Sequence, residues 1–134
     1  MKKRAYKFQM LLAALAACAT IVTSQADLSA SDKQFLAAYE KVRGALAADE
    51  LGTAKSAAKD LGKEGVELSN AASLKDARDS FEKLTIRAKT LAAGQSGYFV
   101  MHCPMLKKDW VQTSDKPSNP YYGKSMANCG ELKE

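Results

Sequence analysis

Apolar residues recur every three or four positions along much of this chain, and this spacing is the feature that most restricts its fold. A repeat of three and four places side chains on one face of an α-helix. In residues 31–48 the repeating residues are Phe35, Tyr39, Val42 and Leu46. Ser29 or Ser31 precedes them and offers a hydroxyl oxygen that can cap the first turn. We therefore predict a helix over this segment.

Residues 74–91 carry the clearest helical repeat. Ser73 and Asp76 resemble the pair that caps a helix N-terminus, and Gly94 or Gly97 follows where the helix is expected to end. The repeating apolar residues are Leu74, Ala77, Phe81, Leu84, Ala88 and Leu91. Stripes of this kind form bundle cores far more often than cofactor sites, so we interpret them as scaffold.

Residues 49–68 show the same spacing with smaller side chains, and glycines at positions 52, 62 and 65 weaken the helical pattern. Small residues either let a neighbouring helix approach closely or mark a break, and the sequence leaves both open. Together the three segments predict an all-α protein. The expected fold is a small antiparallel helical bundle with an irregular C-terminal segment rich in Cys, His and Met.

The first 26 residues have the composition of a secretory signal peptide. Four basic residues lie among the first seven, an apolar run follows from 8 to 22, and Ser24 and Ala26 suit signal-peptidase cleavage after Ala26. The apolar run is short and Ala-rich for a helix that spans a bilayer. These features predict export, giving a soluble periplasmic protein.

Cys18 leaves a second interpretation of the N-terminus open. Leu15-Ala16-Ala17-Cys18 fits the motif in which the Cys thiol is acylated and the signal ends before Cys18. Against it, residues 19–22 remain apolar where a lipoprotein usually turns polar. Lipidation at Cys18 would anchor the protein to the membrane, and it is the only membrane association that we expect.

Removal of residues 1–26 leaves 16 basic and 15 acidic residues, interspersed along the chain. Nucleic-acid binding needs a clustered basic face, so we exclude it. The remaining length suits one domain. We expect a helical bundle over residues 27–97 and a C-terminal metal-binding segment, residues 98–134, packed on that bundle.

The chain after Gly97 has a different composition from the helical part. It holds all three prolines, the only His, the only Trp and two cysteines. Pro104 biases the preceding Cys103 toward an extended backbone, and Met126 and Cys129 are spaced to share one face of a helical turn. The candidate metal ligands are His102, Cys103, Met105, Met126 and Cys129, with Met101 as a further candidate.

Thiolate, thioether and imidazole groups together select soft metal ions. Copper(I) therefore ranks first as the bound ion, with silver(I) as its chemical equivalent. Zinc bound through His102, Cys103 and Cys129 ranks second, because it lacks a fourth protein ligand.

Cys103 and Cys129 also have a simpler interpretation. Two cysteines in an oxidising compartment commonly form a disulfide, worth about 3 kcal/mol here, and methionines commonly fill gaps in a core. A thiol enzyme using Cys103 and His102 is disfavoured, because adjacent side chains rarely point at each other and no orienting acid is evident. We do not expect an enzyme.

Four runs in the C-terminal segment resemble a bacterial exported family. They are YFVMHCPM at 98–105, DWVQ at 109–112, NPYYGKSM at 119–126 and CG at 129–130. The family is the domain of unknown function 3347, which also occurs on periplasmic adaptor proteins of copper and silver efflux systems. The resemblance implies a helical bundle and a metal-handling segment in which His102, Cys103, Met105, Met126 and Cys129 match the family's motif.

The sequence therefore predicts a periplasmic protein that binds copper(I) or silver(I) and buffers it, confers resistance, or hands it to efflux components. The alternative is a structural or interaction module in which a Cys103–Cys129 disulfide pins the C-terminal segment and metal has no physiological role.

Overall fold

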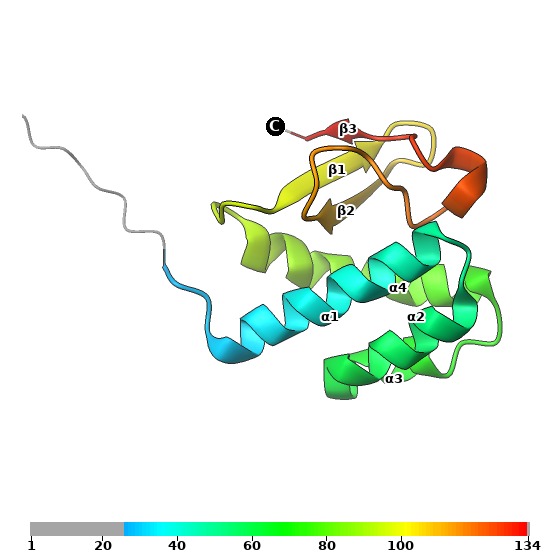
Figure 1. The fold of residues 1–134 in the computed structure, drawn as a ribbon, viewed down its shortest axis with the longest axis horizontal. Helices are drawn as coiled ribbons and strands as arrows, with labels where there is room; N and C mark the ends of the chain where they lie inside the picture. The colour runs from blue at the N-terminus through cyan, green and yellow to red at the C-terminus, as the bar shows by residue number, and fades with distance from the viewer. Residues whose placement is uncertain (1–25, 134) are drawn as a thin grey trace, which may run out of the picture.

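The structure, a computed structural model, describes residues 26–133 (Figure 1). The expected signal peptide and the expected lipidation at Cys18 fall on residues 1–25 and thus lie outside that part. Within the part described, none of the helices combines the length and the apolar character needed to span a bilayer.

The two long predicted helices are confirmed. Helix α1 spans Ala30–Ala47, and the Ser29 side chain accepts a hydrogen bond from the Asp32 backbone N–H at 3.1 Å. Helix α4 spans Leu74–Ala92, and Ser73 caps it through the Asp76 N–H in the same way. Both caps satisfy backbone donors that have no partner within the helix.

The middle segment is not one continuous helix. It forms α2, Leu51–Ala58, the 3-10 helix η1, Lys59–Gly65, and the short α3, Val66–Ser69. Gly62 breaks the helical path with φ 59° and ψ −131°. Gly65 serves close approach, because a Cβ there would lie 1.8 Å from the Ala58 carbonyl oxygen. Both roles that the sequence left open for small residues are therefore used, at different glycines.

Aromatic side chains join the helices to the C-terminal part. Tyr39 of α1 stacks on Phe81 of α4 with ring centroids 4.6 Å apart, and Phe81 meets Tyr121 edge-on at 5.8 Å. Tyr121 in turn meets Trp110 edge-on at 6.4 Å. One hydrophobic core therefore runs through both parts of the molecule.

The predicted all-α class is wrong, because the C-terminal segment forms a three-stranded antiparallel sheet. Strand β1 spans Phe99–Cys103, β2 spans Lys108–Gln112 and β3 spans Glu131–Leu132. The strand order is β2-β1-β3. The 3-10 helix η2, Gly123–Met126, lies in the connection from β2 to β3. The protein is therefore a mixed α/β fold.

Side-chain alternation explains why these residues form strands. Met101 and Cys103 are fully buried on one face of β1, whereas His102 between them points to the other face. Trp110 is the register partner of Met101, and Asp109 is that of His102. The hairpin turn contains no glycine, and Lys107 supplies the positive φ of 54°. That missing glycine removed the usual hairpin signal from the sequence.

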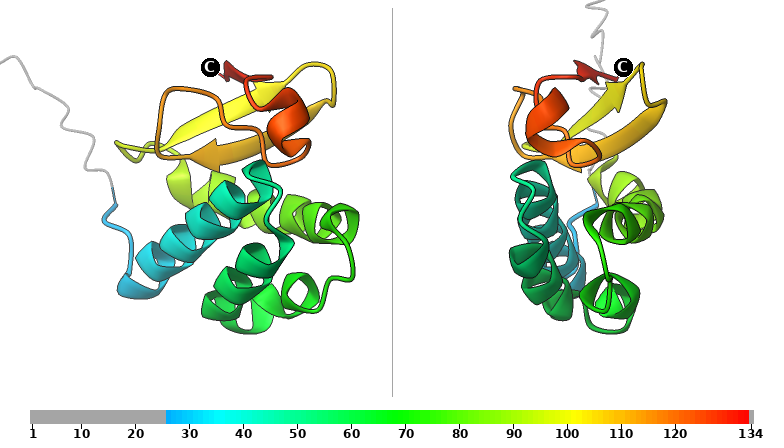
Figure 2. Two further views of the ribbon diagram at one scale, coloured as in Figure 1. Left: turned by 45° about the vertical axis from the view of Figure 1, so that its right-hand side comes forward. Right: turned by 90° about the vertical axis from the view of Figure 1, so that its right-hand side faces the viewer.

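The sheet lies between two coverings (Figure 2). One face packs on α4 and α1, where the Tyr39 hydroxyl accepts a hydrogen bond from the Val111 N–H. Residues 113–130 cover the other face. There Gly130 lies so close to Trp110 that a Cβ on the glycine would be 2.6 Å from the indole ring.

Candidate metal site

The structure brings Cys103 and Cys129 together, although 26 positions separate them in the sequence. Both are free thiols. The side-chain interaction with Cys103, followed by burial, raises the pKa of the Cys129 thiol above its ordinary value. A thiolate beside a second thiolate is unfavourable because the two negative charges repel, so the pair favours the neutral, protonated form. A cation or a covalent bond between the sulfurs would remove that repulsion.

Cys103 is held by the regular part of the fold. It ends β1 and is fully buried, and its carbonyl oxygen accepts a hydrogen bond from the Lys107 N–H at 2.8 Å, which closes the hairpin turn. The extended backbone expected before Pro104 is confirmed.

Cys129 is held by the covering segment instead. Its N–H donates to the Met126 carbonyl oxygen at 3.0 Å, and its own carbonyl oxygen accepts from the Asn119 side-chain amide at 2.9 Å. Gly130 follows directly and lets the chain pass against Trp110 without a clash. These three contacts fix the position of a half-buried thiol.

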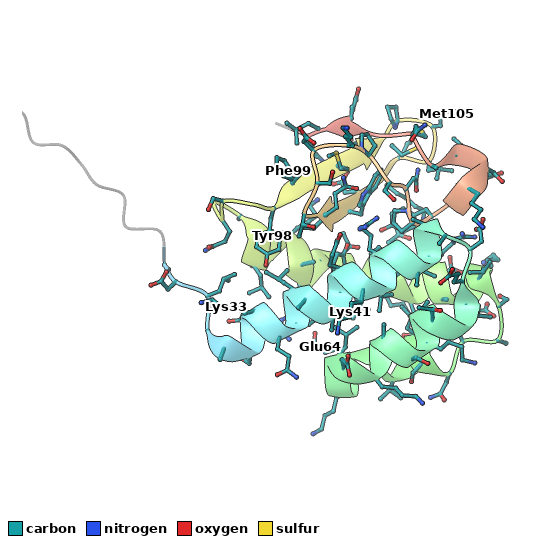
Figure 3. All side chains as sticks on the ribbon, viewed as in Figure 1. Lys33, Lys41, Glu64, Tyr98, Phe99 and Met105 are labelled. Atoms are coloured by element: carbon teal, nitrogen blue, oxygen red, sulfur yellow. The ribbon has the colours of Figure 1, made fainter. Side chains whose placement is uncertain are left out.

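The three candidate methionines lie in the same segments as the thiol pair and differ in depth. Met101 shares the inner face of β1 with Cys103 and is fully buried. Met126 is half-buried and ends η2, and its carbonyl oxygen accepts the hydrogen bond from the Cys129 N–H. Met105 lies in the hairpin turn with 77% of its surface exposed (Figure 3). Its backbone N–H interacts with the Cys129 thiol and acts to lower that thiol's pKa, opposing the effect of Cys103.

His102 lies apart from the thiols. It points to the opposite face of β1, where its Nδ1 lies 2.7 Å from the Asp109 carboxylate. The part of the chain that the structure describes contains no cluster of three or more His, Cys, Asp or Glu side chains able to hold a metal. The predicted zinc ligands are thus not assembled, and of the candidate ligands on β1 only Met101 and Cys103 share a face.

Asp109 is a residue whose importance the sequence analysis missed. Its carboxylate accepts hydrogen bonds from Lys89 of α4, from Lys133 at 2.7 Å and from His102. Burial opposes ionisation, but these three donors outweigh it and hold the pKa of Asp109 well below its ordinary value. Only the register of the hairpin, which pairs His102 with Asp109, places these two side chains on one face, and simple alternation along the sequence would have separated them.

Asn119 and Gly130 were missed as positioning residues for a different reason. Their partners, the Cys129 carbonyl and the Trp110 ring, come from other parts of the segment, and no local sequence pattern predicts such contacts.

Comparison with protein-family models, with curated proteins and with solved structures gave no match for this chain.

Proposed function

We propose that this protein binds a soft metal ion, copper(I) before silver(I), through Cys103 and Cys129, and that it buffers the ion or hands it on in the periplasm. One observation carries the proposal: two free thiols from distant parts of the chain meet at the edge of the core. Sulfur ligands select copper(I) over the harder divalent ions, and copper(I) is satisfied by two thiolates.

Metal binding also resolves the electrostatics of the pair. A metal-bound thiol is deprotonated, and the positive ion compensates two adjacent negative sulfurs that would otherwise repel. The raised pKa of Cys129 makes proton release part of metal capture, so affinity rises with pH. His102 is no longer part of the expected ligand set, because Asp109 holds it on the other face.

Two methionines on the neighbouring segments suit a route for exchange. Met105 is mostly exposed beside Cys129, and Met126 is half-buried on the same segment. A partner's sulfur ligand can thus attack an ion held by a half-exposed thiol before the buried Cys103 releases it. The proposal also includes export and hand-over to an efflux component. Export is supported by the composition of residues 1–26, and the hand-over by the likeness of the C-terminal runs to the domain of unknown function 3347.

A copper(I) competition experiment tests the proposal. Reduced protein is titrated against a chromophoric copper(I) chelator without oxygen, for the wild type and for C129S and C103S. We expect one ion per chain and a loss of about 100-fold or more in affinity in either variant, because one sulfur cannot replace two. C129S is the more decisive variant, since Cys129 is only half-buried and its replacement leaves the core intact.

The matched control is H102A. The structure predicts that this change leaves copper(I) affinity within about twofold, since an imidazole held elsewhere contributes nothing to the site. Unchanged affinity in both Cys variants would refute the proposal. A large loss in H102A would show that the ligands rearrange to include the imidazole.

The same thiol pair favours a second function, a disulfide that fixes the covering segment to the sheet. The bond would close a loop over residues 103–129 and stabilise the fold by about 3 kcal/mol. Mass spectrometry of protein from its native compartment separates the two. Bound copper with two cysteines that alkylate after metal removal supports the metal site, whereas a protein two hydrogens lighter and resistant to alkylation supports the disulfide.

A further inference from the structure

A second feature of interest lies on the opposite face of the sheet from the thiols. A cavity of about 440 Å³ opens between α4 and the sheet, and His102, Asp109 and Lys133 line it on the sheet side. From α4 it is lined by Glu82, Ile86 and Lys89, among others. Its volume is in the range of small-ligand pockets.

The lining of this cavity carries an excess of positive charge. Four lysines line it, Lys89, Lys107, Lys108 and Lys133, against the two carboxylates of Glu82 and Asp109. Lys108 pairs with Glu82, while Lys89 and Lys133 share the same Asp109 oxygen. Among residues 26–133, Lys107 has no ion-pair partner, and its backbone is held at a positive φ of 54°. With four lysines and two carboxylates, the lining has a net charge of +2 with the imidazole counted as neutral, and an anion would balance it.

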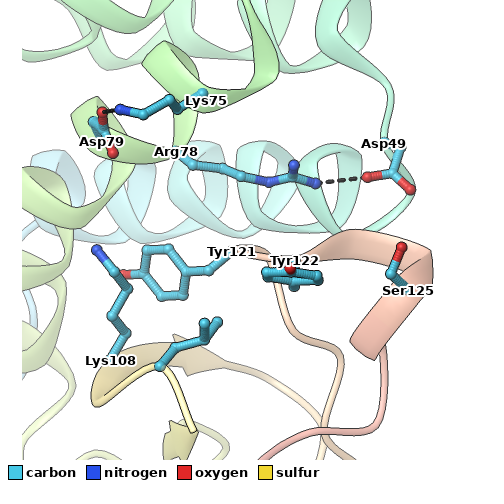
Figure 4. A pocket seen from close by; sticks show the side chains of 9 residues that line it. Asp49, Lys75, Arg78, Asp79, Lys108, Tyr121, Tyr122 and Ser125 are labelled. Atoms are coloured by element: carbon cyan, nitrogen blue, oxygen red, sulfur yellow. Dashed lines mark hydrogen bonds and ion pairs between the residues drawn. The ribbon is translucent and has the colours of Figure 1, made fainter.

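The neighbouring hollow shows that this imbalance is local. That hollow, of about 390 Å³, lies toward the N-terminal half of α4 and shares Lys108 with the first (Figure 4). Its charged groups are matched, with Arg78 on Asp49 at 2.6 Å and Lys75 on Asp79 at 2.7 Å. No comparable surplus of cations is available there.

His102 adds a directional group to the cationic cavity. Its Nδ1 is engaged by Asp109 at 2.7 Å, which fixes the ring. Within the described part of the chain Nε2 has no hydrogen-bond partner, and the ring is 29% exposed where it lines the cavity. A ring held by a carboxylate through one nitrogen presents the other nitrogen in a fixed direction.

We propose that this cavity binds a small oxyanion, carried by a phosphate or a carboxylate group, with Lys107 and Lys133 supplying charge and N–H donors and with the His102 ring held in a fixed position beside it. Charge-assisted hydrogen bonds of this kind are short and strong. Ile86, which is 73% exposed, adds an apolar side chain to the rim of the cavity, which suits an anion with a small organic body. The site is separate from the thiol pair and does not depend on metal binding.

The single histidine makes the test direct, because untagged protein gives one imidazole signal in an NMR spectrum. Reduced, metal-free protein is titrated at fixed pH and low salt with inorganic phosphate, with citrate, and with sodium chloride at matched ionic strength. We expect the His102 ring signal to move to saturation with phosphate, with citrate, or with both, but not with chloride. Phosphate alone would identify a phosphoryl ligand and citrate alone a carboxylate ligand; saturation with neither, or an equal change with chloride, overturns the proposal.

Two lysine variants locate the binding. K107A removes the cavity's unpaired cation and is expected to weaken the oxyanion about fivefold at low salt. K33A removes an exposed lysine of α1 far from the cavity and is expected to have no effect. Unchanged binding in K107A, or equal weakening in both variants, overturns the assignment to this cavity. The C129S protein should bind the oxyanion like the wild type, so failure of the metal proposal would not affect this result.

Discussion

At the scale of single residues, Asp109 links the two halves of the molecule. Its carboxylate contacts the Lys89 ammonium of α4, the Lys133 ammonium that follows β3 and the His102 imidazole of β1. It is 14% exposed, so these bonds form in a partly water-excluded setting and are stronger than bonds between fully exposed side chains. Asp109 therefore orients His102 and also fastens the sheet to the helical layer.

Replacing Asp109 with Asn should lower the free energy of unfolding by about 2 kcal/mol at neutral pH, because charge-assisted hydrogen bonds are lost. The pKa of Asp109 is held below its ordinary value in the folded state. Its contribution is therefore fully present above the unfolded pKa of about 4 and is lost as the pH falls. The gap between the wild type and D109N should narrow from pH 7 to pH 3.

Urea unfolding followed by circular dichroism at several pH values measures this gap. D115N is the matched control, since Asp115 is exposed and forms no ion pair within the described residues; it should change stability by less than about 0.5 kcal/mol. A gap that stays constant with pH would show that Asp109 stabilises the fold by packing and not by charge.

At the scale of elements, the helices were predictable and the sheet was not. Ser29 and Ser73 stand directly before apolar repeats, and cap and repeat together define α1 and α4 from local sequence. The strands β1 and β2 are five residues each and joined by a turn without glycine. Short strands depend on partners distant in sequence, so propensity alone identifies them poorly.

The candidate site was predictable in its residue types but not in its grouping. Cys103 and Cys129 meet as their chemistry suggested, but residue spacing could not show that β1 turns His102 to the other face. The alternation of strand side chains decides that separation. Recognising the strand would have removed His102 from the ligand set.

Two glycine-to-alanine changes should have opposite effects on stability. A Cβ at Gly44, inside α1, meets nothing within 4 Å, so G44A should stabilise the protein by about 0.5–1 kcal/mol through helix propensity. A Cβ at Gly65 would lie 1.8 Å from a backbone oxygen of Ala58, so G65A should destabilise it by about 2 kcal/mol or more.

Thermal and urea unfolding of both variants and the wild type measure the sign of each change in the free energy of unfolding. Each variant serves as the control for the other, because the chemical change is the same. Equal effects in the two proteins would mean that α2 and η1 do not approach each other as closely as the structure shows.

At the scale of the whole molecule, the thiol pair joins the end of the sheet to the segment that covers it. A bound ion there would hold residues 113–130 against the sheet. At about 100 times its Kd, copper(I) should add about 2.7 kcal/mol to the free energy of unfolding, which raises Tm by about 10 °C for a domain of this size.

Differential scanning calorimetry of the reduced protein without oxygen, with and without copper(I), checks this rise. C129S should unfold at nearly the same temperature under both conditions, because the ion has lost one of its two sulfurs. A comparable rise in C129S would place the stabilising ion elsewhere on the protein.

The shortness of β3 has a consequence for solubility. Its backbone pairs with Met101 and His102, and the Lys133 N–H donates to the Val100 carbonyl, so three residues shield the outer edge of β1. The charged side chains of Glu131 and Lys133 flank this edge and discourage the addition of a strand from another copy. A chain lacking residues 131–133 would expose an apolar edge that includes Val100 and Met101, and it would be prone to aggregate through β-strand pairing.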